Sequence, residues 1–247
     1  MLTALRTWLG VVRSLRIYYG GGHDRATMDR LYARFVKPGD LVFDVGSHVG
    51  DRIAAFRRLG ARVVACEPQP ALVRMLRLIY GRDKAVLIEP LAVGAKAGEI
   101  ELNINVDNPT VSTASREFIK ASQGAPGWQG QNWDKSVKVP MTMLDALILR
   151  HGFPTFIKID VEGFEAEALA GLTQPVAALS FEFTTIQRDV ARACVARCHA
   201  LGYLRYNGAL GESQTLVHDE WQNADAIVRW LDDLPMEVNS GDVYATR

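Results

Sequence analysis

The sequence is short of several features that mark particular classes of protein. Its 247 residues include only three cysteines, Cys66, Cys194 and Cys198. This odd count cannot form a paired disulfide framework and suits a reducing compartment. The formal net charge is zero, and no block of Lys and Arg suggests a nucleic-acid partner. We therefore expect a cytoplasmic protein that does not bind nucleic acid.

Long apolar runs are also missing from the sequence. No run reaches the roughly 18 residues that a membrane-spanning helix needs. Residues 1–20 place Arg6, Arg13 and Arg16 among leucines, which interrupts any signal-peptide core. This segment predicts an amphipathic helix that packs on the domain or on a partner subunit, as in a homo-oligomer. Peripheral membrane contact is the alternative, because the helix is basic and carries Trp8.

What the sequence does have is a regular alternation of strand and helix patterns. Short apolar segments that predict strands lie at 41–46, 61–67, 85–93, 155–163 and 176–183. Their interiors are continuous apolar runs, which is typical of strands covered on both faces. The alternation predicts right-handed β-α-β units, and therefore an α/β fold with a mostly parallel sheet and helices on both faces.

The pattern divides the chain into an extension and one main domain. Residues 1–38 are predicted to form an N-terminal helical extension, and residues 39–247 the main domain. Residues 107–136 interrupt the domain as an irregular, lid-like insertion. Because this insertion carries Trp128 and Trp133, we expect it to pack rather than to be a disordered loop.

Three local features are also predicted outside the main alternation. Thr142 is predicted to cap a helix that runs to residue 150. Near the carboxyl terminus, residues 203–207 and 214–218 are predicted to pair as antiparallel strands. The last segment, 241–247, is expected to be either a strand or a tail.

A glycine turn, FDVGSHVG, follows the first predicted strand. Gly46 permits a tight turn, and Gly50 permits close approach of the next helix. The glycine spacing differs from the G-x-G-x-x-G pattern of a dinucleotide site. Asp44 before the turn would repel a pyrophosphate but suits a cationic amino group. Ser47 and His48 lie within the turn, and His48 is either a base in the cleft or a structural residue.

An acid ends the next predicted strand. Glu67 follows Gly46 by 21 residues, a position from which a carboxylate can accept hydrogen bonds from both hydroxyls of a ribose. Pro68 then turns the chain away. A surface glutamate at a strand end is common by itself, but its combination with the glycine turn favours a ligand that contains adenosine.

Further acids lie at the ends of two later strands. Asp160 and Glu162 follow Lys158 in the segment KIDVEGFE, and Glu182 ends the neighbouring predicted strand. Ligands bind at the carboxyl edge of open α/β sheets, so these acids are candidates to orient a substrate hydroxyl or to take its proton. Alternatively, Asp160 and Glu162 only cap the next helix. No three-ligand metal motif is apparent, although the three acids can converge on a divalent cation.

The insertion supplies candidates for contact with a substrate. Asn108, Ser112, Thr113 and Trp133 carry hydrogen-bonding groups or an aromatic ring within the predicted lid. We expect these side chains to touch the substrate if the insertion folds over the site.

Together these segments resemble the FkbM-type family of class I S-adenosylmethionine-dependent methyltransferases. The resemblance spans residues 39–183 and rests on DVGSHVGD, VVACEPQP, PLAVGAKAGEIEL, VPMTMLDAL, FIKIDVEGFEAEALAGL and LSFEF. It implies a Rossmann-like fold whose seven-stranded sheet has a reversed last strand. It also implies S-adenosylmethionine as the methyl donor, and transfer to a hydroxyl on a saccharide, lipid or natural product.

The resemblance further implies roles for particular residues. Those facing the cofactor would be Asp44, Gly46 and Gly50 at the methionine part, Glu67 at the ribose, and Ala92 near the adenine. Asp160 and Glu162 would flank the sulfonium. Ser47 and His48 stand where the family frequently has Ala-Asn, which preserves the turn but leaves the role of His48 open.

Two other functions compete with methyl transfer. A nicotinamide-dependent oxidoreductase can use a similar sheet, but the missing G-x-G-x-x-G pattern and the acid before the turn disfavour it. A non-catalytic binding module that kept the fold is the second alternative. The intact glycine turn and Glu67 disfavour that interpretation.

Overall fold

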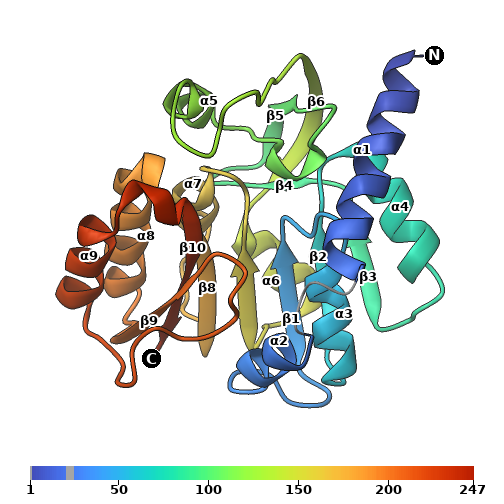
Figure 1. The fold of residues 1–247 in the computed structure, drawn as a ribbon. Helices are drawn as coiled ribbons and strands as arrows, with labels where there is room; N and C mark the ends of the chain where they lie inside the picture. The colour runs from blue at the N-terminus through green and yellow to red at the C-terminus, as the bar shows by residue number, and fades with distance from the viewer. Residues whose placement is uncertain (1, 21–24) are drawn as a thin grey trace.

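A seven-stranded sheet runs through the centre of the computed structural model, which describes residues 2–20 and 25–247 (Figure 1). Its strands are β1 (Leu41–Val45), β2 (Arg62–Cys66), β3 (Val86–Glu89), β7 (Phe156–Ile159), β8 (Ala178–Thr184), β9 (Arg205–Leu210) and β10 (Ser240–Thr246). Their order is β3-β2-β1-β7-β8-β10-β9. Only β10 runs antiparallel to its two neighbours, and the other pairs are parallel. The predicted α/β fold with one reversed strand is confirmed.

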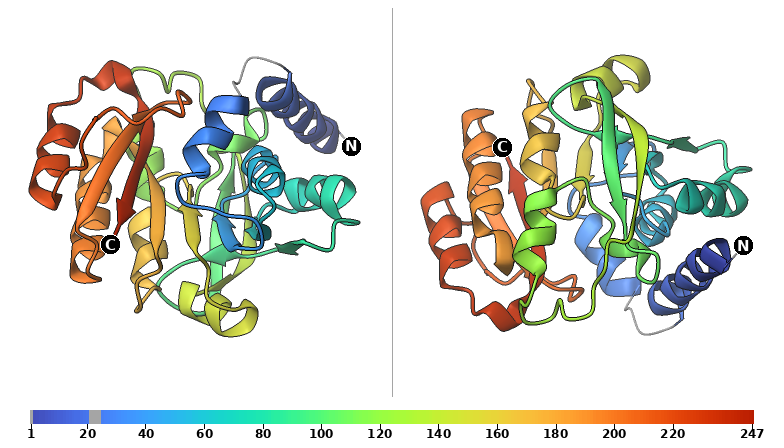
Figure 2. Two further views of the ribbon diagram at one scale, coloured as in Figure 1. Left: turned by 90° about the horizontal axis from the view of Figure 1, so that it is seen from below. Right: turned by 90° about the horizontal axis from the view of Figure 1, so that it is seen from above.

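Helices cover both faces of this sheet (Figure 2). One face carries α2 (Arg25–Tyr32), α3 (Asp51–Arg58) and α4 (Pro70–Tyr80), and the other carries α6 (Leu144–His151), α7 (Glu165–Ala170), α8 (Arg188–Ala200) and α9 (Ala224–Asp233). Neighbouring strand residues are therefore both buried. Val42 packs toward α3 and Phe43 toward α6, which explains the continuous apolar runs in the sequence.

The segment 85–93 is two strands rather than the single predicted strand. β3 pairs with β2 in the main sheet, whereas β4 (Ala92–Val93) pairs with β6 (Lys135–Thr142) in a second sheet. This second sheet has the order β4-β6-β5, with β5 at Gly98–Ile104. Pro90 lies between β3 and β4, and because it has no N–H to donate, it interrupts the ladder.

The predicted cap of α6 is wrong. Thr142 ends β6, where its carbonyl accepts a hydrogen bond from the N–H of Gly94 at 2.9 Å. Met143 takes the N-cap position and provides no side-chain cap. Thr142 therefore belongs to a strand, and not to the start of the helix as the sequence pattern predicts.

The predicted terminal pair of strands is also wrong. β9 pairs with β10 along its whole length, and residues 214–218 contribute only the isolated bridge between Leu216 and Ala209. The last segment is thus an interior strand, which pairs with β8 and β9. Paired on both edges, β10 satisfies more backbone groups than a short hairpin would.

The short 3-10 turns η2 (Thr185–Gln187) and η3 (Met236–Val238) follow β8 and α9.

The insertion is ordered by its own small core. It contains η1 (Pro109–Val111) and α5 (Arg116–Ser122), which lie with β5 and β6 above the main sheet in Figure 1. Phe118 and Trp128 are buried with their ring centroids 4.9 Å apart. The Trp133 indole donates a hydrogen bond to the Val111 carbonyl at 2.7 Å.

The N-terminal helix α1 (Leu2–Tyr19) packs along the side of the domain. Gly10 lies against Val106 and Pro109 of the insertion. The Tyr19 hydroxyl contacts the Tyr80 hydroxyl at 3.0 Å. The sequence continues after this helix with glycines at 20–22, of which residues 21 and 22 lie outside the described residues. Within the described ranges, no helix combines the length and apolar character needed to cross a bilayer.

The turn after β1 touches the end of β7. The backbone of Gly46 has a φ of +83°, and a Cβ there would lie 1.7 Å from the carbonyl oxygen of Asp160. The N–H of Asp160 in turn donates to the Val45 carbonyl at 2.9 Å. Only glycine allows this contact, which joins the two strand ends that carry the candidate site.

We predict that Gly46→Ala destabilises the protein by at least about 3 kcal/mol, because it adds a backbone clash to an unfavourable φ. Urea denaturation measures this loss. Gly39→Ala is the matched control, since Gly39 has a φ of +89° with no atom within 4 Å of the added Cβ. It should cost only about 1 kcal/mol. Equal losses in the two variants would refute the role of the close contact.

Candidate cofactor and active site

A pocket opens at the carboxyl ends of β1, β2, β7 and β8. Its empty volume is about 990 Å³, which includes the open space at its mouth. Most of the residues predicted from the sequence line it, namely Asp44, Gly46, Ser47, His48, Glu67, Pro68, Ala92, Ser112, Asp160, Glu162 and Glu182. The fold thus brings together segments that are far apart in the sequence.

The other four candidate residues do not line the pocket, namely Gly50, Asn108, Thr113 and Trp133. A Cβ on Gly50 would lie 2.7 Å from the ring of Tyr80, so this glycine serves the packing of α3 against α4. Thr113 donates its hydroxyl to the Glu162 carbonyl at 2.6 Å. Asn108 bonds to Asn105, just before the insertion, and to Gln131 within it, and Trp133 is held in the insertion by its bond to Val111. Asn108, Thr113 and Trp133 therefore order the segments around the pocket.

Glu67 points toward the glycine turn. One of its carboxylate oxygens accepts from the N–H of His48 at 2.9 Å, and the other accepts from the N–H of Gln69 at 2.7 Å. Burial raises the pKa of Glu67 to about 7, against the effect of these two bonds. A carboxylate has about four lone-pair sites, so each oxygen can still accept a bond from a ligand hydroxyl.

Asp44 is a buried acid whose Oδ2 has no hydrogen-bond partner within the described part of the chain. Burial, and next the charge of Asp51, raise the pKa of Asp44 to about 7, although Lys158 opposes the rise. An unpaired buried carboxylate is unfavourable. A positively charged group in the pocket would stabilise its ionised form.

His48 is a poor candidate for a base. Its backbone has a φ of +51°, in the left-handed region, and its N–H is committed to Glu67. Burial lowers the pKa of the imidazole to about 4. The ring is therefore neutral at pH 7 and has little affinity for a substrate proton.

Lys158 is a buried cation between two acids. Its Nζ donates to Asp160 Oδ2 at 3.0 Å and to Asp242 Oδ1 at 2.9 Å, and its side chain is only 1% exposed. Burial acts to lower the pKa of Lys158, but the two carboxylates hold it well above the usual value. Burial likewise acts to raise the pKa of Asp160, yet the charge and hydrogen bond of Lys158 hold it below the usual range. Asp160 is therefore ionised.

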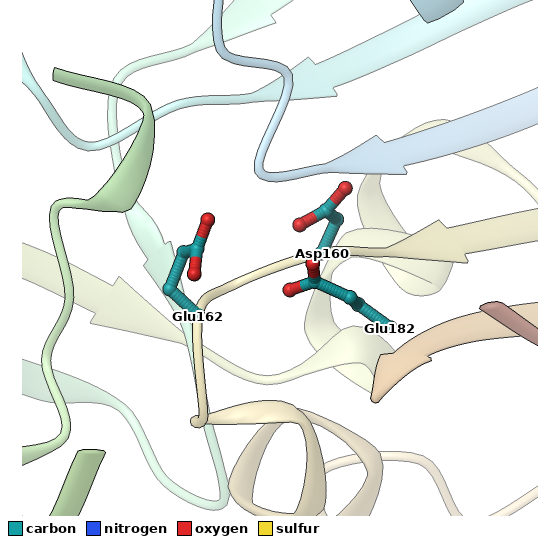
Figure 3. Close-up of side chains that lie close together, drawn as sticks. All are labelled: Asp160, Glu162 and Glu182. Atoms are coloured by element: carbon teal, nitrogen blue, oxygen red, sulfur yellow. The ribbon is translucent and has the colours of Figure 1, made fainter. Parts of the chain in front are cut away.

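Glu162 and Glu182 surround this ionised acid. In Figure 3 their carboxylates and that of Asp160 gather at the ends of β7 and β8, and one oxygen of each lies within 4.8 Å of the others. Burial, followed by the charge of Asp160, raises the pKa of both glutamates well above the usual value. The cluster can therefore hold protons on its glutamates, and its oxygens are also the donors that a hard divalent cation prefers.

Glu165, which the sequence analysis did not single out, holds the turn between β7 and α7. Glu165 accepts hydrogen bonds from the N–H groups of Val161 at 2.9 Å and Gly163 at 3.2 Å. The N-cap residue of α7 is Phe164, and neither Asp160 nor Glu162 caps this helix. Glu162 itself has a φ of +55°, a strained conformation of the kind that clusters at functional sites.

Two further lining residues had no clear signal in the sequence. The Gln69 amide donates to the Pro109 carbonyl at 3.1 Å and to Ser112 Oγ at 3.2 Å, which ties the insertion to the end of β2. Arg52 pairs with Asp51 and, at 2.7 Å, with Glu212 in the loop after β9. The latter pair joins residues 160 positions apart, so no local pattern could reveal it.

The fold and the pocket define the class of protein. A glycine turn after β1, an acid at the end of β2 and one reversed strand in a seven-stranded sheet belong to the Rossmann-like fold of class I methyltransferases. The arrangement agrees with the expectation from the sequence segments.

Comparison with known proteins then gives the family. A model described as the methyltransferase FkbM domain matches residues 44–227, and the chain belongs to this family. S-adenosylmethionine is the cofactor of the family. The suspected resemblance is therefore confirmed, and the family favours methyl transfer over the oxidoreductase alternative.

Individual relatives are distant. The chain is 25% identical over 162 residues to the hexuronic acid methyltransferase AglP of Haloferax volcanii, covering 65% of this chain and 62% of the relative. It is 27% identical over 168 residues to the 31-O-demethyl-FK506 methyltransferase FkbM of Streptomyces tacrolimicus, covering 58% of this chain and 65% of the relative. The match thus spans less than two thirds of each relative.

Solved structures resemble the chain at low sequence identity. A TehB-like SAM-dependent methyltransferase from Corynebacterium glutamicum has a TM-score of 0.48 at 12% identity, covering 96% of this chain and 95% of that one.

We predict that Lys158→Met destabilises the protein by about 3 kcal/mol, because it leaves Asp160 and Asp242 without their buried cation. The loss should be larger at pH 8 than at pH 5, since Asp160 without Lys158 is left with the effect of burial, which raises its pKa, and can take up a proton at the lower pH. Urea denaturation at the two pH values measures this. In the control, Arg116→Met removes an exposed pair with Glu101 and should change stability by less than about 1 kcal/mol. A pH-independent loss in Lys158→Met would contradict the assigned charges.

Proposed function

We propose that the protein is an S-adenosylmethionine-dependent O-methyltransferase that acts on a hydroxyl of a saccharide, lipid or natural product. The observation that carries the proposal is the pair Asp44 and Glu67. Both are buried acids at adjoining strand ends, both have a pKa near 7 through burial, and both retain unused acceptor sites in the pocket. A ligand with one ammonium group and two vicinal hydroxyls complements them.

The proposed binding mode assigns each part of the cofactor to a wall of the pocket. Asp44 accepts from the methionine ammonium group, and Glu67 accepts from the ribose hydroxyls. Pro68 and Ala92 lie near the adenine, while Gly46 and the rest of the glycine turn follow the methionine part. The ammonium charge would lower the pKa of Asp44 and keep it ionised.

When bound, S-adenosylmethionine supplies an activated methyl group on a sulfonium. The chain has to align the acceptor oxygen and exclude water. Asp160, ionised and oriented by Lys158, is the group best suited to take the proton of the acceptor hydroxyl. Burial and the charge of Asp160 raise the pKa values of Glu162 and Glu182 well above the usual range, so these side chains can hold protons and donate hydrogen bonds to neighbouring oxygens of the acceptor.

The charge of the pocket favours a neutral acceptor. Seven acids line it, namely Asp44, Asp51, Glu67, Asp160, Glu162, Glu182 and Glu212. The lysine and arginine that line it, Lys158 and Arg52, are both committed to ion pairs. A carboxylate or phosphate next to the reacting hydroxyl would meet the ionised Asp160 and find no uncommitted cation among these lining residues. A neutral hydroxyl compound therefore fits better than a uronic acid, the substrate named for the Haloferax relative.

We predict that Asp44→Ala and Glu67→Ala each weaken binding of S-adenosylmethionine at least tenfold, because each removes a charge-assisted hydrogen bond. Isothermal titration calorimetry measures the affinities. Glu99→Ala, which removes an exposed acid from β5, is the control and should bind like the wild type. Wild-type affinity in both pocket variants would overturn the assigned cofactor site.

Two further experiments test the choice of cofactor and the reaction itself. Thermal shift should show stabilisation by S-adenosylhomocysteine and none by NAD. Transfer of labelled methyl from S-adenosylmethionine is then measured on a panel of neutral glycosides, uronides and hydroxylated natural products. An alkali-stable methyl ether on a neutral acceptor supports the proposal, whereas exclusive formation of an alkali-labile methyl ester would contradict O-methylation of a hydroxyl.

A further inference from the structure

The helix α1 has apolar side chains on two faces. Val11 is fully buried against the domain, and Leu15 packs on the same core. Trp8, Leu9 and Val12 remain 41%, 60% and 39% exposed. Successive residues of a helix are rotated by about 100°, so Leu9 and Val12 point away from the side that Val11 occupies. This outer face is not covered by any described part of the chain.

The helix is fixed to the domain near both of its ends. Arg6 forms an ion pair with Asp107 of the insertion through two hydrogen bonds. Tyr19 donates its hydroxyl to the Val49 carbonyl at 3.2 Å. Figures 1 and 2 show α1 lying along the side of the domain. The outer face is therefore held at the surface.

The charge on this surface has one sign. The segment 2–19 contains three arginines and no acidic residue. Arg6 is neutralised by Asp107, but Arg13 and Arg16 are exposed and form no ion pair within the described ranges. Arg25 adds a third positive charge at the same end of the helix, where its guanidinium donates to the Tyr19 carbonyl at 3.0 Å.

We propose that the outer face of α1, comprising Trp8, Leu9, Val12, Arg13 and Arg16, docks the protein on an anionic membrane surface. Such a surface accepts apolar side chains at the boundary between head groups and acyl chains while its phosphates pair with arginine. Tryptophan is enriched at this boundary. A second copy of the chain suits the face less well, because a two-fold contact would bring the arginines of both copies together.

Docking would place the candidate active site beside the membrane. Pro109 both contacts Gly10 of α1 and lines the pocket. The helix, the insertion and the pocket wall are thus in direct contact. This inference is independent of the proposed methyl transfer, since membrane binding is measured without cofactor or acceptor.

The test is co-sedimentation of the full chain with vesicles of equal parts phosphatidylglycerol and phosphatidylcholine. Binding is expected at low salt, with a large loss at 0.5 M salt through screening. Arg13→Gln with Arg16→Gln should lower the partition coefficient about 30-fold, and Leu9→Glu with Val12→Glu at least tenfold. Leu149→Glu is the matched control, because Leu149 on α6 is 90% exposed at another surface. It should bind like the wild type.

Calorimetry with S-adenosylhomocysteine and thermal unfolding confirm that each variant is folded. Three results would overturn the proposal. The first is a wild-type protein that does not bind the anionic vesicles. The second is equal binding to vesicles of phosphatidylcholine alone. The third is a wild-type dimer, seen by sedimentation velocity, that Leu9→Glu with Val12→Glu dissociates without changing vesicle binding.

Discussion

The contact between the turn after β1 and the end of β7 is the constraint on which the site depends. Gly46 faces the carbonyl oxygen of Asp160 at a distance that leaves no room for a Cβ. The two central strands can therefore end side by side with an acid at each end. Asp44 and Asp160 belong to the two halves of the proposed reaction, one binding the cofactor and the other facing the acceptor, and this contact fixes their separation.

Burial and neighbouring charges give the acids of the pocket different pKa values. The positive charge of Lys158 keeps Asp160 ionised. In contrast, burial and then the charge of Asp160 raise the pKa values of Glu162 and Glu182. Asp44 lies next to Lys158 in the sheet register but makes no ion pair with it. One buried cation thus keeps Asp160 ionised, while the pKa values of Glu162 and Glu182 are raised. In the proposed function, Asp44 gains its cation from the cofactor.

Much of this arrangement could be predicted from local patterns. Pro70 and Gly81 mark the two ends of α4 in the sequence, and the spacing of Glu67 from the glycine turn indicates its place at the pocket. The partners Asp242 and Glu212 could not be found, since their contacts with Lys158 and Arg52 span 84 and 160 residues. The split of the third predicted strand was also missed, because periodicity alone does not show which sheet a strand joins.

The central claim is that the unpaired acid at the end of β1 is completed by the ammonium group of the cofactor. A pH titration of the Asp44 carboxyl by carbon-13 NMR, assigned with Asp44→Asn, tests it directly. Without ligand the pKa should be about 7, and saturation with S-adenosylhomocysteine should lower it by about two units. An Asp44 pKa that does not change when the ligand binds would contradict the account.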